Sequence, residues 1–189
     1  QPELVRNLCR EAMAKSGQFN PQGITNTLWA LATMKFEQPE LVRNFCREAM
    51  AKSGHFNPQN IANTLWALAA MKMEQPELVR NLCREAMAKS GHFNPKEIAS
   101  TLWALATMKM EQPELVRNLC REAMAKSGPF NPQNIANTLW ALATMKIEQS
   151  ELVRNLCREA MAKSGHFSTQ EIANTLWALA AMKMEQPEL

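Results

Sequence analysis

The sequence repeats itself with a period of 37 residues, and this regularity limits the fold more than any other feature. Gln-Pro-Glu-Leu begins at residues 1, 38, 75, 112 and 186, and Gln-Ser-Glu-Leu takes its place at residue 149. Periods of about 20 to 50 residues are typical of solenoids, whose units bury their apolar faces only by stacking. We therefore expect a single repeat array across residues 1–189, with repeats at 1–37, 38–74, 75–111, 112–148 and 149–185 and the start of a further repeat at 186–189.

Each repeat begins with a segment whose apolar residues follow helical spacing. In the first copy, residues 2–16 place Leu8 and Cys9 on one face, and Pro2 suits the first turn of a helix. The glycine that follows, Gly17, predicts a left-handed cap at the end of this helix. A first helix is therefore expected in this part of every repeat.

A second helix is predicted over residues 21–35. Asn20 is a favourable N-cap and Pro21 a favourable first residue, while Ile24 and Leu28 belong to one apolar stripe. No segment of the repeat alternates between apolar and polar residues as a β-strand does. The predicted fold is all-α: an α-solenoid of five stacked helical hairpins that form a right-handed superhelix.

Composition and residue types exclude several functional classes. No apolar run is long enough to span a bilayer, so a membrane partner is not expected. The chain has 3 His, and its 5 Cys occupy one phase of the repeat, which supplies neither a disulfide framework nor a zinc site. No nucleophile recurs beside a base, so we expect no enzyme, no cofactor and no metal. The cysteines are predicted to be buried thiols: Cys9, Cys46, Cys83, Cys120 and Cys157.

The copies differ mainly before the second helix and along its polar edge. A solenoid that recognises a polymer needs constant positions for its scaffold and variable exposed positions for discrimination. Single-stranded RNA can be contacted in this way, with one base per helical repeat. We expect two positions of each repeat to face RNA bases, and we call them the variable stripe: Gly23, Asn26, Asn60, Asn63, Glu97, Ser100, Asn134, Asn137, Glu171 and Asn174.

Two arginines recur in every first helix. RNA phosphates are uniform along a strand and are held by uniform cations. We expect these arginine ladders to face the RNA phosphates: Arg6, Arg10, Arg43, Arg47, Arg80, Arg84, Arg117, Arg121, Arg154 and Arg158. Glutamates in the same repeats hold the net charge to +3.

Structural interpretations compete with each of these assignments. Glu97 and Glu171 follow Asn94 and Ser168 by three residues, which is the spacing of a capping box. Asn26 and the asparagines equivalent to it could bond to a backbone carbonyl of an adjoining repeat, and the arginines could pair with glutamates on a solvated face. Core packing is expected of the tryptophans, with base stacking as the alternative: Trp29, Trp66, Trp103, Trp140 and Trp177.

Residues 56–69 have a recognisable sequence, FNPQNIANTLWALA, and close variants of it occur in every copy. This sequence resembles the signature of octatricopeptide repeats, and the period is similar to that of heptatricopeptide repeats. The resemblance implies a paired-helix α-solenoid that binds RNA at about one nucleotide per repeat. It also implies a role in RNA processing, stability or translation in chloroplasts or mitochondria, or in a bacterial protein. The chain departs from the pattern at Lys35, where glycine is common, and at Ser168-Thr169.

These features favour sequence-selective binding of single-stranded RNA. Two alternatives remain open. One is a superhelical scaffold for proteins or peptides. The other is an array that associates end to end, because the terminal repeats have no distinct polar capping sequence.

Overall fold

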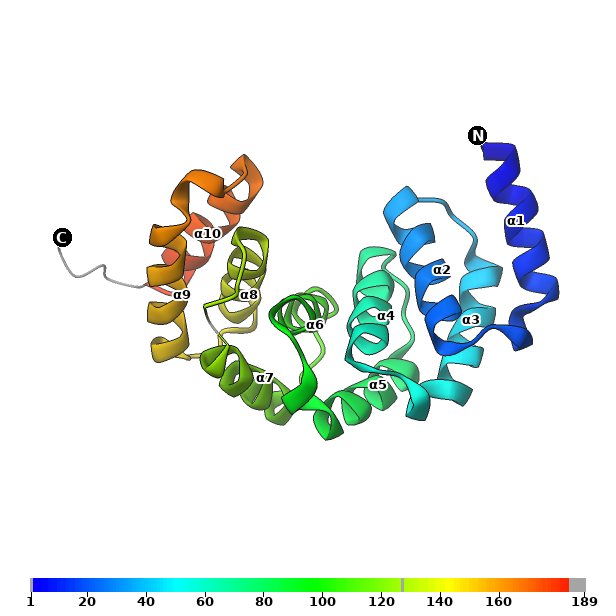
Figure 1. The fold of residues 1–189 in the computed structure, drawn as a ribbon, viewed down its shortest axis with the longest axis horizontal. Coiled ribbons are helices and arrows are strands. Elements are labelled where there is room, and N and C mark those ends of the chain that lie inside the picture. Colours follow the sequence, from blue (N-terminus) through cyan, green and yellow to red (C-terminus); the bar gives the residue numbers. More distant parts are fainter. Residues whose placement is uncertain (1, 127, 184–189) are drawn as a thin grey trace. The chain divides into compact units, whose positions relative to one another are not determined.

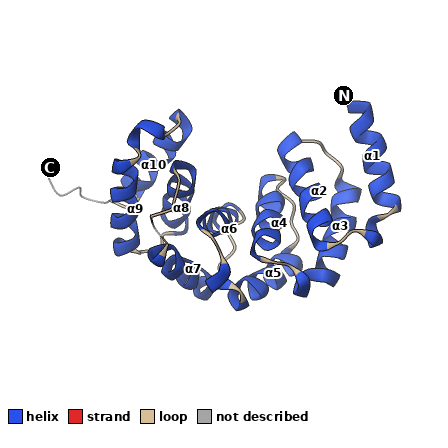
Figure 2. Cartoon of the chain, in the orientation of Figure 1, coloured by secondary structure: helices blue, strands red, loops and turns tan. Residues whose placement is uncertain are grey.

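A computed structural model describes residues 2–126 and 128–183, and all regular secondary structure in these ranges is helical (Figures 1 and 2). The α-helices of the described residues are α1 (Pro2–Ala14), α2 (Pro21–Met34), α3 (Pro39–Lys52), α4 (Pro58–Ala70), α5 (Pro76–Ala88), α6 (Pro95–Thr107), α7 (Pro113–Ala125), α8 (Pro132–Met145), α9 (Ser150–Ala162) and α10 (Thr169–Ala181). The predicted all-α class is confirmed. The right-handed superhelix stays a prediction, and the further repeat expected at 186–189 lies outside the described residues.

The cap predicted at Gly17 is wrong. A 3-10 turn, Ser16–Gln18, follows α1, and no glycine in the described ranges has a positive φ. The left-handed residue is instead Lys35, with φ 50°, at the end of α2. The amide of Phe36 then donates to the carbonyl of Leu31 at 3.0 Å, which closes the helix end as a glycine would. We call this lysine and its equivalents the left-handed lysines: Lys35, Lys72, Lys109, Lys146 and Lys183.

The described residues form two compact units, one up to Lys89 and one from Ser90 onward. Within the first unit, α2 packs along α4, while α1, α3 and α5 touch one another sparsely. Within the second unit, α8 packs against both α6 and α10, and α7 touches α9 sparsely. In each unit the second helices of the hairpins therefore form a tightly packed row, which we call the second-helix row.

Positions that are apolar in every repeat build the core. Phe45 of α3 is fully buried, and its ring meets that of Phe19 edge-on with 4.9 Å between ring centroids. The prediction of buried thiols is confirmed for Cys9, Cys46, Cys83 and Cys120. Burial raises the pKa of the last three to about 12. Cys157 is only half-buried.

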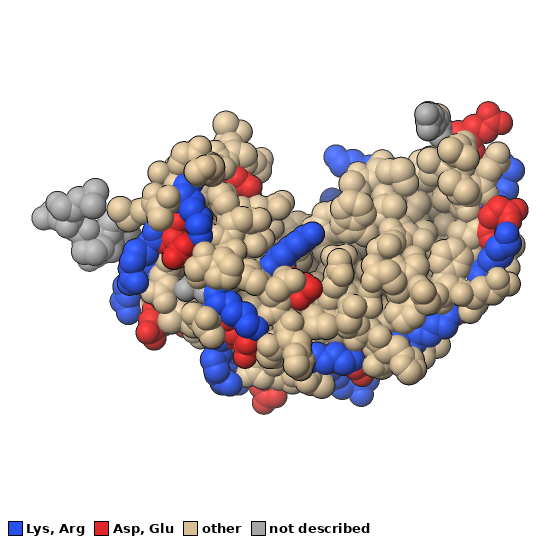
Figure 3. All heavy atoms as spheres, in the orientation of Figure 1, with Lys and Arg blue, Asp and Glu red and all other residues tan. Residues whose placement is uncertain are grey.

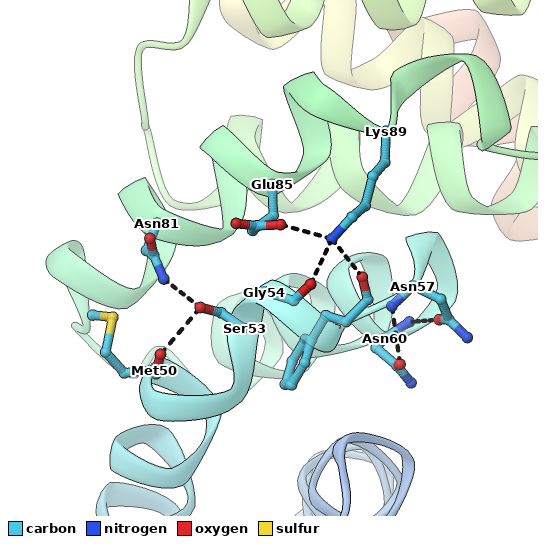
Figure 4. A network of polar contacts seen from close by, with 9 residues as sticks. Met50, Ser53, Gly54, Asn57, Asn60, Asn81, Glu85 and Lys89 are labelled. Atoms are coloured by element: carbon cyan, nitrogen blue, oxygen red, sulfur yellow. Dashed lines mark hydrogen bonds and ion pairs between the residues drawn. The ribbon is translucent and has the colours of Figure 1, made fainter.

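From the second repeat onward, a lysine at the end of the first helix fastens its repeat to the one before it (Figure 4). The Nζ atom of Lys89 donates to the carbonyl oxygens of Gly54 at 3.2 Å and Phe56 at 2.9 Å, and it pairs with Glu85 at 2.6 Å. The same contacts recur at Lys52, Lys126 and Lys163, and we call these four the bridging lysines. Charged donors on backbone carbonyls make strong hydrogen bonds. Repeat stacking therefore includes polar as well as apolar contacts.

Candidate nucleic-acid interface

The first position of the variable stripe caps the second helix. The backbone amide of Asn94 donates to Glu97 Oε2 at 2.8 Å, and the amide of Glu97 donates to Asn94 Oδ1 at 2.9 Å. Ser168 and Glu171 form the same reciprocal pair, with 2.7 Å between the Ser168 nitrogen and the carboxylate. The capping-box interpretation of both glutamates is confirmed. Gly23 occupies the same position, where its amide donates to Asn20 Oδ1 at 2.8 Å.

Asn60 and Asn134 were predicted to lie in an exposed stripe, and that placement is wrong. Their exposed fractions are 3% and 6%. The position lies about 260° around the helix from Ile24, on the flank that meets the preceding second helix. Asn60 Nδ2 donates across this junction to Gln22 Oε1 at 3.0 Å. Tight packing of neighbouring second helices therefore removes Asn60 and Asn134 from solvent, whereas Gly23, Glu97 and Glu171 at the same position remain partly exposed.

The second position of the variable stripe does reach solvent. Asn26 is exposed, and Asn63, Ser100, Asn137 and Asn174 are partly exposed. Asn26 Oδ1 accepts from Gln22 Nε2 at 2.8 Å, and Asn174 Oδ1 accepts from Gln170 Nε2 at 2.9 Å. These two asparagines therefore bond within their own helices and not to the backbone of an adjoining repeat. Their side-chain NH₂ groups can still donate to a ligand.

The tryptophans do not behave as core residues. Trp29 is 45% exposed and Trp177 is 50% exposed, while the other three are partly exposed. Within the first unit, the rings of Trp29 and Trp66 lie 6.4 Å apart and are tilted by 35°. Within the second unit, Trp140 lies 6.3 Å from Trp103 and 6.4 Å from Trp177. The result in each unit is a row of partly exposed indoles, one per repeat, which we call the tryptophan ladder.

The tryptophan lies about 140° around the helix from Ile24, and the second stripe position lies at about 200°. The exposed edge of each second helix thus carries an indole next to an asparagine or serine. On α8, neither flank of this edge is available, because α6 and α10 pack against both sides of the helix. The exposed surface of the second helix, which can contact a ligand, therefore lies nearer the tryptophan than the predicted variable stripe does.

The arginine ladders lie on the other side of each hairpin. All ten arginines are exposed. They lie about 160° and 200° around the first helix from the Leu8 position, and its equivalents are buried, as Phe45 shows. They consequently face away from the second helices. Figure 3 shows Lys and Arg atoms along the first helices, whereas the visible surface over the second helices is largely uncharged.

The described residues do not show the expected pairing of arginines with glutamates. Each of their ion pairs joins a lysine to a glutamate four residues before it, as in Lys52–Glu48 at 2.9 Å. Three arginines donate instead to an asparagine three residues before them: Arg10, Arg47 and Arg84, at 3.2, 3.0 and 3.0 Å. The arginines keep most of their donors free for another anion.

Comparison with known proteins identifies the family of the chain. Over residues 1–189 the chain matches the family described as RNA-editing substrate-binding complex 6 protein, RESC6. The chain belongs to the RESC6 family. No curated protein matches it. The name of the family refers to a complex that binds RNA-editing substrates, and a helical protein with an RNA-related role is what the repeats predict.

In this RESC6-family chain, sequence analysis overlooked one set of cations. The left-handed lysines are exposed, and each lies one or two residues after the end of a second helix. Helices α2, α4 and α8 contain no charged residue, so the left-handed lysines after them are the first charges that follow those helices in the sequence, each with an exposed glutamate two residues later, such as Glu37 after Lys35. A lysine recurs at the end of every predicted second helix, and this recurrence is the sequence signal that could have identified them.

The described side chains offer no cluster of three or more His, Cys, Asp or Glu that could hold a metal ion. None of the helices in the described ranges has the length and apolar character needed to cross a membrane.

Proposed function

We propose that this RESC6-family chain is a non-enzymatic array that binds single-stranded RNA along its second-helix row, with about one nucleotide per repeat. One observation carries the proposal: every second helix presents an indole next to a small polar side chain, in the same register from repeat to repeat. Membership of the RESC6 family supports RNA as the ligand. We also propose that the repeats are of the octatricopeptide or heptatricopeptide kind.

Selectivity among bases should come from the second stripe position. Four repeats carry asparagine there, and the third carries Ser100. Repeats two and four, with Asn63 and Asn137, should prefer the same base. Glu97 and Glu171 already cap their helices, so their carboxylates contribute to base preference only if a base displaces the capping contact.

The arginine ladders face away from this surface. We propose that they act at longer range by raising the local concentration of RNA, which makes their contribution strongly dependent on ionic strength. Direct contact with phosphates of the same strand is not required of them. Replacing arginines should then slow association while changing dissociation little.

The test is a fluorescence-anisotropy titration with labelled RNA oligomers of increasing length, in single-stranded and double-stranded form. Affinity should rise with length up to about five nucleotides and then level off. The logarithm of the association constant should fall with the logarithm of salt concentration with a slope near −3.5, for about five neutralised phosphates. Absence of binding to single strands, or equal binding to duplex, would overturn the proposal.

A peptide is the second candidate ligand, because the second-helix row, with few charged residues, suits an extended chain. Two residues of an extended strand span about 6.6 Å, close to the 6.3 to 6.4 Å of the tryptophan ladder. Binding of a peptide should depend little on salt, which separates it from RNA in the same titration.

End-to-end self-association is a further proposal, which rests on exposed apolar residues of α1 and α10. Leu4 and Leu8 are 54% and 58% exposed, and Ile172 and Leu176 are 44% and 62% exposed. Their equivalents at the junctions inside each unit are buried, so a second copy could cover both faces as an internal repeat does.

A further inference from the structure

We propose that the tryptophan ladder is the platform on which RNA bases stack, and that the left-handed lysines, not the arginine ladders, contact the phosphates. This inference rests on the proposed function and names the side chains that contact the RNA. Aromatic side chains that stack successive bases, combined with cations that follow the backbone, are how proteins hold single strands without regard to sequence.

The first step is that the indoles are not needed to fill the core. Ile24, Leu28 and Leu31 already bury the core side of α2, with exposed fractions of 0%, 0% and 2%. Trp29 on the same helix remains 45% exposed. Within each unit the row of such residues forms an apolar strip, and a strip of this kind on a protein surface commonly marks a binding site.

The second step is the spacing. Stacked bases rise by about 3.4 Å along one strand, and neighbouring indoles lie 6.3 to 6.4 Å apart, nearly twice as far. A strand with one base on each indole is therefore stretched, and its bases are separated from one another. Separated bases are the form in which proteins contact single-stranded RNA. A duplex, whose bases remain stacked at the shorter rise, does not fit this spacing.

The third step is the position of the cations. Lys146 follows Trp140 by six residues, which is about 9 Å along the helix axis. A lysine side chain starting there can approach a phosphate whose base lies on the indole. The arginines of the same hairpin, Arg117 and Arg121, project from the first helix in the opposite direction. The left-handed lysines, and not the arginines, are therefore the cations that contact phosphates on the second-helix row.

The chain itself supplies the spectroscopic readout. It has 5 Trp and 0 Tyr, so its intrinsic emission comes from the ladder. Titration of the whole chain with decauridylate RNA should quench this emission, in parallel with binding measured by anisotropy. Binding without quenching would overturn the inference and leave the proposed function intact. Failure of the chain to bind single-stranded RNA at all would overturn the proposed function itself.

Three variants of repeat four separate the contacts. Trp140→Leu keeps an apolar side chain and should lower affinity about ten-fold or more without changing the salt slope. Lys146→Gly should lower affinity and reduce the slope by about 0.7. Glycine suits the left-handed backbone, so a loss of binding in this variant cannot come from unfolding. Arg121→Gln, the matched control on the first helix, should leave the dissociation rate of RNA unchanged.

The opposite pattern would contradict the assignment. If Arg121→Gln speeds RNA dissociation and reduces the slope while Lys146→Gly and Trp140→Leu behave as the parent chain, the RNA lies on the first helices. If an extended peptide quenches the ladder and RNA does not, the platform belongs to a peptide. Melting curves for all variants show whether each one is folded.

Discussion

The bridging lysines provide a sharp test of how the repeats are held together, and Lys89→Met is the most informative substitution. Methionine keeps the apolar stem of the side chain and removes its three charged hydrogen bonds, to Gly54, Phe56 and Glu85. Hydrogen bonds of charged groups make a net contribution of about 1.5–3 kcal/mol each, and less where water can replace the lost partner. The side chain of Lys89 is 27% exposed, and water can reach the freed carbonyls. We expect a total loss of about 2 kcal/mol in the free energy of unfolding.

Lys15→Met is the matched control. Lys15 has the same sequence neighbours and the same glutamate partner, Glu11 at 2.9 Å, but its side chain is 58% exposed and bridges to no carbonyl in the described residues. Exposed pairs of this kind contribute about 0–1 kcal/mol. Urea unfolding followed by circular dichroism measures both variants. Equal losses in the two would refute the claim that the inter-repeat carbonyl bonds stabilise the stack.

Three further outcomes follow from the structure. Lys109→Gly should stabilise the chain by about 1 kcal/mol, because a non-glycine residue in the left-handed region is strained by about that amount, and a lower urea midpoint would contradict this. Asn94→Ala should lower the free energy of unfolding by about 1 kcal/mol through loss of the N-cap, whereas Glu97→Gln, which can still accept from the Asn94 amide, should lower it less in the same assay. Burial raises the pKa of Cys46, Cys83 and Cys120 to about 12. Their unfolded thiols ionise near 9, so stability should be intact below pH 9 and fall between pH 9 and 12, and a flat profile across that interval, measured by urea unfolding, would argue against buried neutral thiols.

Much of the fold could be predicted from one repeat. Pro2 and Pro21 set the starts of α1 and α2, and the predicted second helix, residues 21–35, differs from Pro21–Met34 by one residue. The helix end was harder to predict. Glycine is the usual left-handed residue, yet the last-turn hydrogen bonds place Lys35 there and leave Gly17 in a 3-10 turn.

The candidate site could be predicted only in part, because its exposure depends on neighbouring repeats. A helical wheel of one helix puts Trp29 at the margin of the apolar stripe and Asn60 on the polar side. The adjacent second helix covers the Asn60 position and leaves the tryptophan position open. The bridging role of Lys89 likewise depends on carbonyls that lie a full repeat earlier in the chain. The sequence of a single repeat does not show which of its residues contact the neighbouring repeats.

The most direct test of the central claim is to crosslink RNA containing 4-thiouridine to the chain and to locate the crosslinks by mass spectrometry. Trypsin cleaves after lysine and arginine, so residues 16–35 and 53–72 each form a peptide that contains a whole second helix, while residues 36–43 belong to the next first helix. Binding along the second-helix row predicts crosslinks in the peptides 16–35 and 53–72, concentrated at their tryptophans. Crosslinks confined to the arginine-bearing first-helix peptides would contradict it.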